Sequence, residues 1–397
     1  MALWQADLVP ADAAAAAAFE SAYGGRPSGV WSAPGRVNLI GEHTDYNGGL
    51  ALPIGLPQRT YAAVRLGDDG RFRATSTSAS GGVVEMDMDA IGPGEPQGWA
   101  AYLAGVCWAL REEGVAVPGV DIAVASDVPV GAGLSSSAAL ECSLVAALSD
   151  LLGLGLLADD EGRARAAALC QRAENEIAGA PTGGMDQAAS MRVTPGHAIL
   201  LDCRSGEVEQ VPVDLGSEDL ALLVVDTRAE HALVDGQYAA RRASCERAVE
   251  ALGVTTLRDI DPADLDNALD RLGDDETRAR VRHVVTEIER TRRCVEALRR
   301  EDFDEVGRLF IASHASLRDD YEVSCRELDL VVDTAMATGA LGARMTGGGF
   351  GGSAIALVPA ADADRVAGRI VDEFEGAGLT GPQSFVVTAG APAARDR

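Results

Sequence analysis

The sequence predicts a folded protein of two domains, each of which mixes helices with strands. The chain has 397 residues, of which 47% are hydrophobic and 24% charged, a composition typical of globular proteins with a sizeable core. At roughly 100–200 residues per domain, this length favours two domains. Between Pro195 and Glu218 the pattern changes from short β-type segments to long charged helices, so we expect domains at 1–212 and 213–397.

The N-terminal half opens with an alanine-rich helix, predicted at Ala11–Tyr23, and continues with segments whose alternation is typical of strands. Strands are predicted at Gln58–Leu66, Phe72–Ser76, Val83–Met88 and Val120–Ser126, and a mixed β-type region reaches about Val213. Helical spacing of apolar residues or flanking turn signals predict helices at Trp99–Glu113, Ser136–Leu152 and Asp160–Ala178.

The C-terminal half begins with a buried strand at Leu222–Asp226 and continues with charged helices. These are predicted at Gln237–Leu252, Thr277–Arg300 and Phe303–Leu317, followed by a helix near Ala361–Glu375 and a strand at Ser384–Thr388. Arginine and glutamate alternate through Thr277–Arg300, which favours a solvated face carrying i,i+4 ion pairs.

Charge and composition exclude several classes of function. The 34 basic and 61 acidic residues give a formal charge of −27, which repels polyanions, so we expect no nucleic acid or membrane partner. All the basic residues are arginine. P-loop enzymes, protein kinases and enzymes that form a Schiff base, including those with pyridoxal phosphate, each need a lysine and are therefore excluded.

The cysteines and the N-terminal segment predict a cytoplasmic protein. Seven cysteines lie scattered without a CxxC pair, which predicts reduced thiols. The N-terminus shows no basic region ahead of an apolar stretch, and no window resembles a transmembrane helix of about 18 or more apolar residues.

The segment GRVNLIGEHTDYNGG, Gly35–Gly49, concentrates hydrogen-bonding side chains in a short stretch. Carboxylates accept hydrogen bonds from hydroxyl groups while arginine and histidine donate them, a mixture that suits a neutral polyol. A polar turn between two strands has a similar composition, and the residues alone leave both interpretations open.

The segment VPVGAGLSSSAALE, Val128–Glu141, joins a predicted strand to a predicted helix through small residues. Backbone N–H groups and the helix dipole can hold a di- or triphosphate there without lysine. A hydroxyl such as that of Ser137 can ligate Mg²⁺. A glycine-rich loop that serves only as a tight turn is the alternative.

The segment MTGGGFGGSAIAL, Met345–Leu357, places five glycines immediately before a predicted strand. Glycine permits close approach of the backbone to another group. The pattern fits a hairpin that packs one domain on the other as well as it fits a loop near the nucleotide.

With these three segments in this order, the chain resembles the GHMP family of small-molecule kinases and, within it, the galactokinases. The first segment resembles the galactokinase signature without a visible substitution, and WAAY, RAENEIAGAPTGGMDQ and QYAARR extend the likeness over nearly the full length. The resemblance implies a two-domain α+β fold, GHMP-kinase-like, with the active site in the cleft between the domains. It implies transfer of the γ-phosphate of ATP to the C1 hydroxyl of α-D-galactose, the entry step of galactose catabolism by the Leloir pathway.

The resemblance also implies individual roles. Asp186, which alone would be an ordinary solvated loop residue, would be the catalytic base, with Arg36 beside it. The sugar hydroxyls would be bound by Glu42, His43, Asp45, the backbone of Gly183 and the phenol of Tyr238. The nucleotide would be held by Gly131, Ala132, Gly133, Leu134, Ser135, Ser136 and Ser137, with Trp99 and Tyr102 flanking the adenine, and Mg²⁺ by Ser137 and Glu174.

Several of these residues also have plain structural interpretations. Trp99 and Tyr102 fit the core face of a helix, Tyr238 fits a half-buried packing residue, and Glu174 fits a surface neighbour of Arg172.

Two departures from the family pattern bear on the substrate. Thr182 stands where cysteine is frequent in the family, and Gly184 where a larger apolar residue is common, which puts in doubt the selectivity at C1 and C2 of the sugar. Kinases for N-acetylgalactosamine, arabinose or another related sugar are therefore one alternative, whereas the intact signature argues against mevalonate and homoserine. A sensor that binds galactose and ATP without turnover is the other alternative, and Ser137 and Ala138, which such relatives tend to lack, argue against it. No obligatory protein partner is implied.

Overall fold

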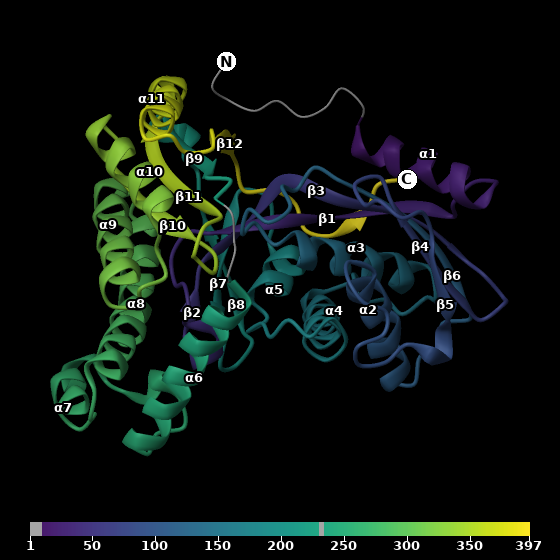
Figure 1. The fold of residues 1–397 in the computed structure, drawn as a ribbon, viewed down its shortest axis with the longest axis horizontal. Coiled ribbons are helices and arrows are strands. Elements are labelled where there is room, and N and C mark those ends of the chain that lie inside the picture. The colour runs from purple at the N-terminus through teal and green to yellow at the C-terminus, as the bar shows by residue number, and fades with distance from the viewer. Residues whose placement is uncertain (1–9, 230–233) are drawn as a thin grey trace.

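The computed structural model describes residues 10–229 and 234–397, which form two β-sheets with helices packed against them (Figure 1). The larger sheet belongs to the N-terminal half and the smaller sheet to the C-terminal half. Among the described residues, no helix combines the length and the apolar character needed to cross a membrane. All seven cysteines lie in the described ranges and have free thiols.

The larger sheet has nine strands, and its main path runs β13-β1-β3-β6-β4-β5, with β2, β7 and β8 joined to it beside β3. Pairing is antiparallel except between β4 and β6. The strands are β1 (Gly29–Asn38), β2 (Leu50–Ala51), β3 (Pro53–Leu66), β4 (Arg71–Ser76), β5 (Val84–Asp87), β6 (Val120–Ser126), β7 (His197–Asp202), β8 (Val208–Pro212) and β13 (Ala394–Arg395).

Helices cover both faces of this sheet, as Figure 1 shows. Alternate residues of a strand point to opposite faces, so Val30 packs against α1 (Ala11–Tyr23) while the neighbouring Trp31 joins the core on the other side. The helices on that other side are α2 (Ala100–Glu112), α3 (Ser136–Leu151), α4 (Asp160–Arg172) and α5 (Met185–Arg192).

The smaller sheet has four antiparallel strands in the order β10-β11-β9-β12. They are β9 (Leu220–Asp226), β10 (Gly342–Thr346), β11 (Ser353–Pro359) and β12 (Gln383–Val387). The helices of this half are α6 (Val234–Leu252), α7 (Leu265–Asp270), α8 (Asp275–Arg299), α9 (Phe303–Asp319), α10 (Arg326–Ala337) and α11 (Ala363–Gly376).

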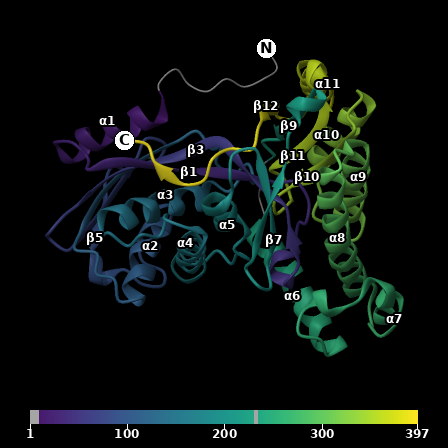
Figure 2. The same cartoon turned by 180° about the vertical axis from the view of Figure 1, so that it is seen from behind.

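Apolar side chains from the two halves of the chain pack together in one core cluster. This cluster contains Val37 and Ile54 of the larger sheet together with Phe310 of α9 and Ile355 of β11. The chain end also returns to the first half, where β13 pairs with β1 (Figure 2). The expected division at residues 212 and 213 stays a prediction.

Most predicted elements are confirmed, and Ala11–Tyr23 and Val120–Ser126 coincide with α1 and β6. The helix predicted at Asp160–Ala178 differs in kind, because its α-helical part ends at Arg172 and a π-helix, Ala173–Ala178, follows. The sequence patterns do not predict α5 and α10.

The expectation of a solvated face in Thr277–Arg300 is wrong for one side of α8. Arg280, His283 and Glu287 on that side are buried, with Glu287 at 0% exposure. A buried charged residue loses its hydration, and it is found only where partners compensate this loss. The partners of Glu287 come from distant segments described below.

Candidate active site

The first and third motif segments line one cavity of about 610 Å³ to which both halves of the chain contribute. The second motif lies beside it and contacts its wall where the carbonyl of Gly133 accepts from Arg36. Its lining consists of Arg36, Glu42, His43, Asp45, Tyr102, Glu174, Ala178, Gly179, Ala180, Pro181, Thr182, Met185, Asp186, Tyr238, Ala239, Gly347 and Gly348. This set contains most of the residues expected to act on the sugar and the metal.

Asp186 and Arg36 form an ion pair on the wall of this cavity. Asp186 lies in the first turn of α5 rather than on a loop, and Arg36 extends from β1. Two guanidinium nitrogens of Arg36, Nε and Nη2, each lie 2.8 Å from Oδ1 of Asp186. Nη1 of Arg36 also donates to the carbonyl of Gly133 at 2.6 Å, so the same side chain touches the second motif.

The second motif forms the turn between β6 and α3, as predicted from its small residues. Gly131 and Gly133 have φ of 77° and 69°, values in the left-handed region that glycine adopts at low cost. Ser135, at φ 59°, also lies in that region although it carries a side chain. No side chain caps the start of α3, and the Oγ of Ser135 donates to Oδ2 of Asp186 at 2.5 Å.

A second cavity of about 320 Å³ lies beside this turn. Trp99, Tyr102, Ser136 and Ser137 line it, together with Val130, whose side chain is 79% exposed. Tyr102 lines both cavities. An exposed valine next to an aromatic slot is the apolar surface that a planar base would cover.

Glu174 and Ser137 are brought together where the two cavities meet. The Ser137 hydroxyl forms a hydrogen bond with the Glu174 carboxylate, and Nε2 of Gln187 donates to the same carboxylate at 2.5 Å. Burial raises the pKa of Glu174 to about 7, and the neighbouring charge of Asp186 adds to this rise. Glu174 is therefore a buried residue of the π-helix and not a surface neighbour of Arg172.

Asp45, Gly183 and Tyr238 are three of the residues expected to bind the sugar, and Asp45 and Tyr238 line the first cavity. A β-carbon at Gly183 would lie 2.1 Å from Oδ2 of Asp45, so only glycine leaves room for that carboxylate. Burial, followed by the charge of Asp186, raises the pKa of Asp45 to about 6. The ring of Tyr238 lies 5.5 Å from that of His43, between centroids.

Both ring nitrogens of His43 form hydrogen bonds within the protein. Its Nε2 lies 3.2 Å from the carbonyl of Gly348, and since a carbonyl can only accept, Nε2 carries the proton. Its Nδ1 therefore accepts from the hydroxyl of Tyr46 at 2.8 Å, and Tyr46 accepts in turn from Tyr321. Burial lowers the pKa of His43 to about 3, which agrees with a neutral ring.

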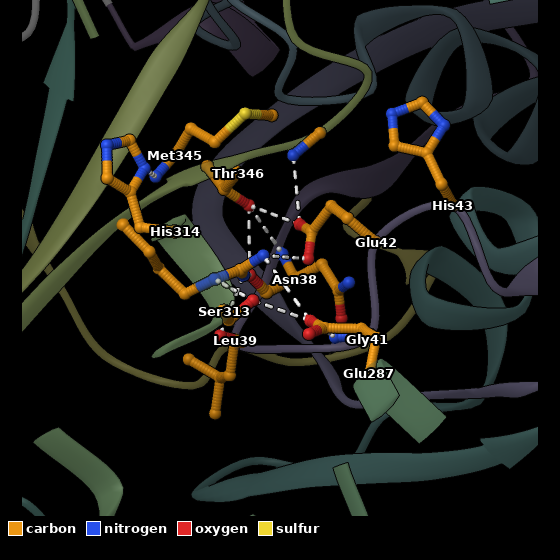
Figure 3. A network of polar contacts seen from close by, with 12 residues as sticks. Asn38, Leu39, Gly41, Glu42, His43, Glu287, Ser313, His314, Met345 and Thr346 are labelled. Carbon is orange, nitrogen blue, oxygen red and sulfur yellow. Dashed lines mark hydrogen bonds and ion pairs between the residues drawn. The ribbon is translucent and has the colours of Figure 1, made fainter. Parts of the chain in front are cut away.

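Glu42 lies in a buried polar network that joins the two halves of the chain (Figure 3). Its Oε1 accepts from the backbone of Gly347 at 3.0 Å and from Thr346, and its Oε2 accepts from the guanidinium of Arg344. Among the described residues Arg344 is the one hydrogen-bond donor to Oε2, and a carboxylate oxygen can accept a second hydrogen bond.

Arg344 of β10 is the centre of this network and is 0% exposed. It donates to the carbonyls of Asn38 and Leu39 at 3.2 and 2.8 Å and to Ser313 at 3.2 Å. Glu287 of α8 lies 3.9 Å from Arg344 and accepts from Ser313 and from the backbone of Gly41. Burial alone would raise the pKa of Glu287, but Arg290 and the other positive groups around it bring it down to about 2.

The third motif links the sugar-side cavity to the second motif. A β-carbon at Gly347 would lie 2.8 Å from the carbonyl of Gly133, and one at Gly352 would lie 3.0 Å from that of Ala132. Both glycines have positive φ, and Ser353 donates to Ala132 at 2.7 Å. The β10-β11 turn therefore packs against the second motif, in agreement with the hairpin interpretation, and Gly347 and Gly348 line the first cavity. A role of this turn beside the nucleotide stays a prediction.

Sequence reasoning missed Arg344, Glu287 and Tyr321, which stabilise the cavity wall from outside it. Arg344 directly precedes the third motif, and this adjacency is the one signal that could have drawn attention to it. Neither its burial nor its partners follow from local patterns, because Asn38, Leu39 and Glu42 lie about 300 residues away along the chain.

Comparisons with known proteins agree with this arrangement. A family model described as the galactokinase galactose-binding signature matches residues 17–66, which include the first motif. Models for the GHMP kinases N terminal domain and the GHMP kinases C terminal match residues 101–192 and 294–376. A galactokinase of Streptomyces coelicolor is 53% identical over 378 residues, covering 95% of this chain and 96% of the relative.

The chain belongs to the galactokinase family of GHMP kinases. Another member of the family, the galactokinase of Bos taurus, is 42% identical over 90% of this chain and 91% of its own length. Among solved structures, Lactococcus lactis galactokinase complexed with galactose superimposes with a TM-score of 0.91 at 32% identity, covering 96% of this chain and 98% of that one. Mevalonate kinase of L. major, at a TM-score of 0.61 and 22% identity over 92% of this chain and 97% of its own, shares the fold alone.

Family membership confirms the expected fold, a two-domain GHMP arrangement of helices and sheets, and the expected class of enzyme, an ATP-dependent sugar kinase.

Proposed function

We propose that this chain transfers the γ-phosphate of ATP to the C1 hydroxyl of α-D-galactose and releases galactose 1-phosphate and ADP. The observation that carries the proposal is that Glu42, His43 and Asp45 of the first motif line one cavity together with the Asp186–Arg36 pair. The turn before α3 contacts this pair through Gly133 and Ser135. The likeness to galactokinases at 42–53% identity over most of the chain supports galactose as the sugar.

Asp186 is the proposed catalytic base. It takes the proton of the C1 hydroxyl while the sugar oxygen bonds to the γ-phosphorus and the bond from that phosphorus to the ADP oxygen breaks. Arg36 compensates the charge of Asp186 and, lying between Asp186 and Gly133, is placed to stabilise charge on the transferring phosphoryl group.

The residues proposed to contact the sugar differ in the hydrogen bonds that each can form. Asp45 accepts from sugar hydroxyls, the Gly183 backbone lies against it, and the phenol of Tyr238 completes the set. Glu42 accepts through Oε2, as the second hydrogen bond of that oxygen. His43 has no N–H left for a hydroxyl and borders the sugar through its ring edge while holding the Gly348 carbonyl.

The proposed nucleotide site combines the uncapped start of α3 with the second cavity. Backbone N–H groups within Gly131–Ser137 bind the phosphates, and the adenine lies in the slot of Trp99 and Tyr102.

The residues at the meeting point of the cavities fit Mg²⁺. Ser137 and Glu174 offer only oxygen ligands. The carboxylates of Glu174 and Asp186 repel each other, and a bound cation would relieve this repulsion. In the described ranges, no group of three or more His, Cys, Asp or Glu residues forms a metal site. Mg²⁺ typically uses one or two protein ligands and completes its shell with phosphates and water. When bound, it neutralises the charge of the β- and γ-phosphates. Location in the cytoplasm and independence of a protein partner stay predictions.

The proposal is tested by coupled detection of ADP release with ATP, Mg²⁺ and a panel of galactose, N-acetylgalactosamine, arabinose, glucose and mevalonate. We expect kcat/KM to be highest for galactose. Preference for another sugar would change the substrate and keep the chemistry. No turnover on any of them, with galactose binding still measured by calorimetry, would identify a sensor instead.

A further inference from the structure

We propose that Ser135 is a positioning residue for the base Asp186 and that its hydroxyl is not part of the phosphate site, an inference that rests on the proposed function. The resemblance had grouped Ser135 with the loop residues that bind phosphate. The structure shows its Oγ donating instead to Oδ2 of Asp186 at 2.5 Å, across 51 residues of sequence.

The backbone of Ser135 supports this assignment. A serine at the residue before a helix ordinarily caps it by accepting from an N–H of the first turn. Ser135 makes no such bond, and its φ of 59° and ψ of 46° put it in the left-handed region, where a residue with a side chain is strained. This conformation directs the hydroxyl away from α3 and toward α5.

The same conformation leaves the first N–H groups of α3 without a side-chain acceptor. Those groups belong to the second motif, where phosphates are proposed to bind, and a capping serine would compete with the ligand for them. The left-handed conformation of Ser135 thus has two effects. It places the hydroxyl against the base Asp186, and it keeps the first N–H groups of α3 available for phosphate.

The partners of Asp186 indicate which oxygen accepts the sugar proton. Oδ1 accepts from Nε of Arg36 and lies 2.8 Å from Nη2 as well, so the guanidinium covers this oxygen. Oδ2 accepts only from Ser135 among the described residues, and a fifth of the Asp186 side chain is exposed to the cavity. The proton of the C1 hydroxyl therefore moves to Oδ2, and Ser135 fixes the direction in which the remaining lone pair of Oδ2 points.

The link also connects two substrate sites. Ser135 lies within Gly131–Ser137, and Arg36 contacts both Asp186 and the carbonyl of Gly133. A shift of the loop would therefore move Oδ2, so the base is aligned when the loop has the conformation that binds phosphate.

The test compares Ser135→Ala, Ser135→Gly and, as a matched control, Ser143→Ala, whose hydroxyl donates to the Leu140 carbonyl within α3. Loss of a hydrogen bond to a charged group lowers rates by about 10- to 100-fold, so we expect kcat of Ser135→Ala to fall by that factor. We expect KM for ATP and for galactose to stay within about threefold of wild type, because binding groups are unchanged. Ser143→Ala keeps the wild-type kcat.

Ser135→Gly separates the hydroxyl from the backbone. Glycine adopts the left-handed conformation without strain, so this variant unfolds at a temperature equal to or above that of Ser135→Ala and yet shows the same loss of kcat. Recovery of kcat in the glycine variant would overturn the proposal. So would a wild-type kcat in Ser135→Ala, or a rise in KM for ATP without a fall in kcat, which would return Ser135 to the phosphate site.

A second measurement does not depend on turnover. In a double-mutant cycle of denaturant unfolding, Ser135→Ala shifts the midpoint in the wild-type background and shifts it less in the Asp186→Ala background, which has no acceptor for the Ser135 hydroxyl. Equal shifts would mean that the two side chains are not coupled and would overturn the proposal. Coupling in a protein that does not phosphorylate galactose would overturn the proposed function and leave the positioning of Asp186 by Ser135 supported.

Discussion

Replacement of Arg344 by methionine tests whether the buried network stabilises the sugar-side wall. Methionine is similar in length and keeps the apolar stem, but it removes every donor. The carbonyls of Asn38 and Leu39 and the buried carboxylate of Glu42 then lose a partner inside the protein. Removing one partner of a buried ion pair costs about 3–5 kcal/mol, and for a chain of this size that corresponds to a fall of roughly 4–6 °C in the unfolding temperature.

The assay is calorimetric unfolding at one scan rate for wild type, Arg344→Met and a surface control, Arg369→Met. Arg369 pairs with Glu373 on α11 at 52% exposure, and an exposed pair of this kind contributes less than about 1 kcal/mol. We also expect KM for galactose to rise more than KM for ATP, since Glu42 and Gly347 line the sugar-side cavity. An Arg344→Met protein that unfolds within about 2 °C of the surface control would refute this reasoning.

Three further predictions concern the proposed chemistry. Asp186→Asn keeps binding of galactose and ATP in calorimetry while turnover is lost, and near-wild-type turnover would remove Asp186 from the role of base. Because burial and Asp186 raise the pKa of Asp45 to about 6, the ionised acceptor is lost as pH falls through that value, and KM for galactose rises about tenfold per pH unit below it. Asp45→Asn removes this dependence, and a flat KM between pH 7 and 5 in the wild type would contradict it. Chelation of Mg²⁺ abolishes turnover without changing galactose affinity, and Glu174→Gln raises the Mg²⁺ concentration needed for half-maximal rate; an unchanged requirement would argue against Glu174 as a ligand.

The elements that the sequence predicted well are those whose signals are local. The alanine-rich α1 and the start of α3 after a glycine-rich turn depend on neighbouring residues, so patterns of a few residues suffice. The π-helix at Ala173–Ala178 was not predictable in this way, because its hydrogen-bonding register differs from that of an α-helix while its composition does not. Helix α5 is short and contains glutamine and serine among buried positions, which hides its apolar face.

In the candidate site too, some residues could be located from the sequence and others could not. Asp186 and Asp45 were located through the resemblance, and the structure brings them to one cavity, with the second motif beside it. The role of Glu287 could not be read from the sequence, because a charged residue on an arginine- and glutamate-rich helix such as α8 resembles a solvated one until its partners are known. The role of Arg344 on β10 could not be read either, because Asn38, Leu39 and Glu42 lie far away along the chain. The same holds for Ser135, whose position in a phosphate-type loop concealed its bond to Asp186.

The central claim, that the C1 hydroxyl of galactose receives the phosphoryl group, is tested most directly by phosphorus NMR of the products formed from ATP, Mg²⁺ and galactose. We expect ADP and one sugar phosphate in equal amounts, with the phosphorus of the sugar phosphate coupled to the anomeric proton. Coupling to the protons of C6, or ATP left intact in the presence of galactose, would contradict the claim.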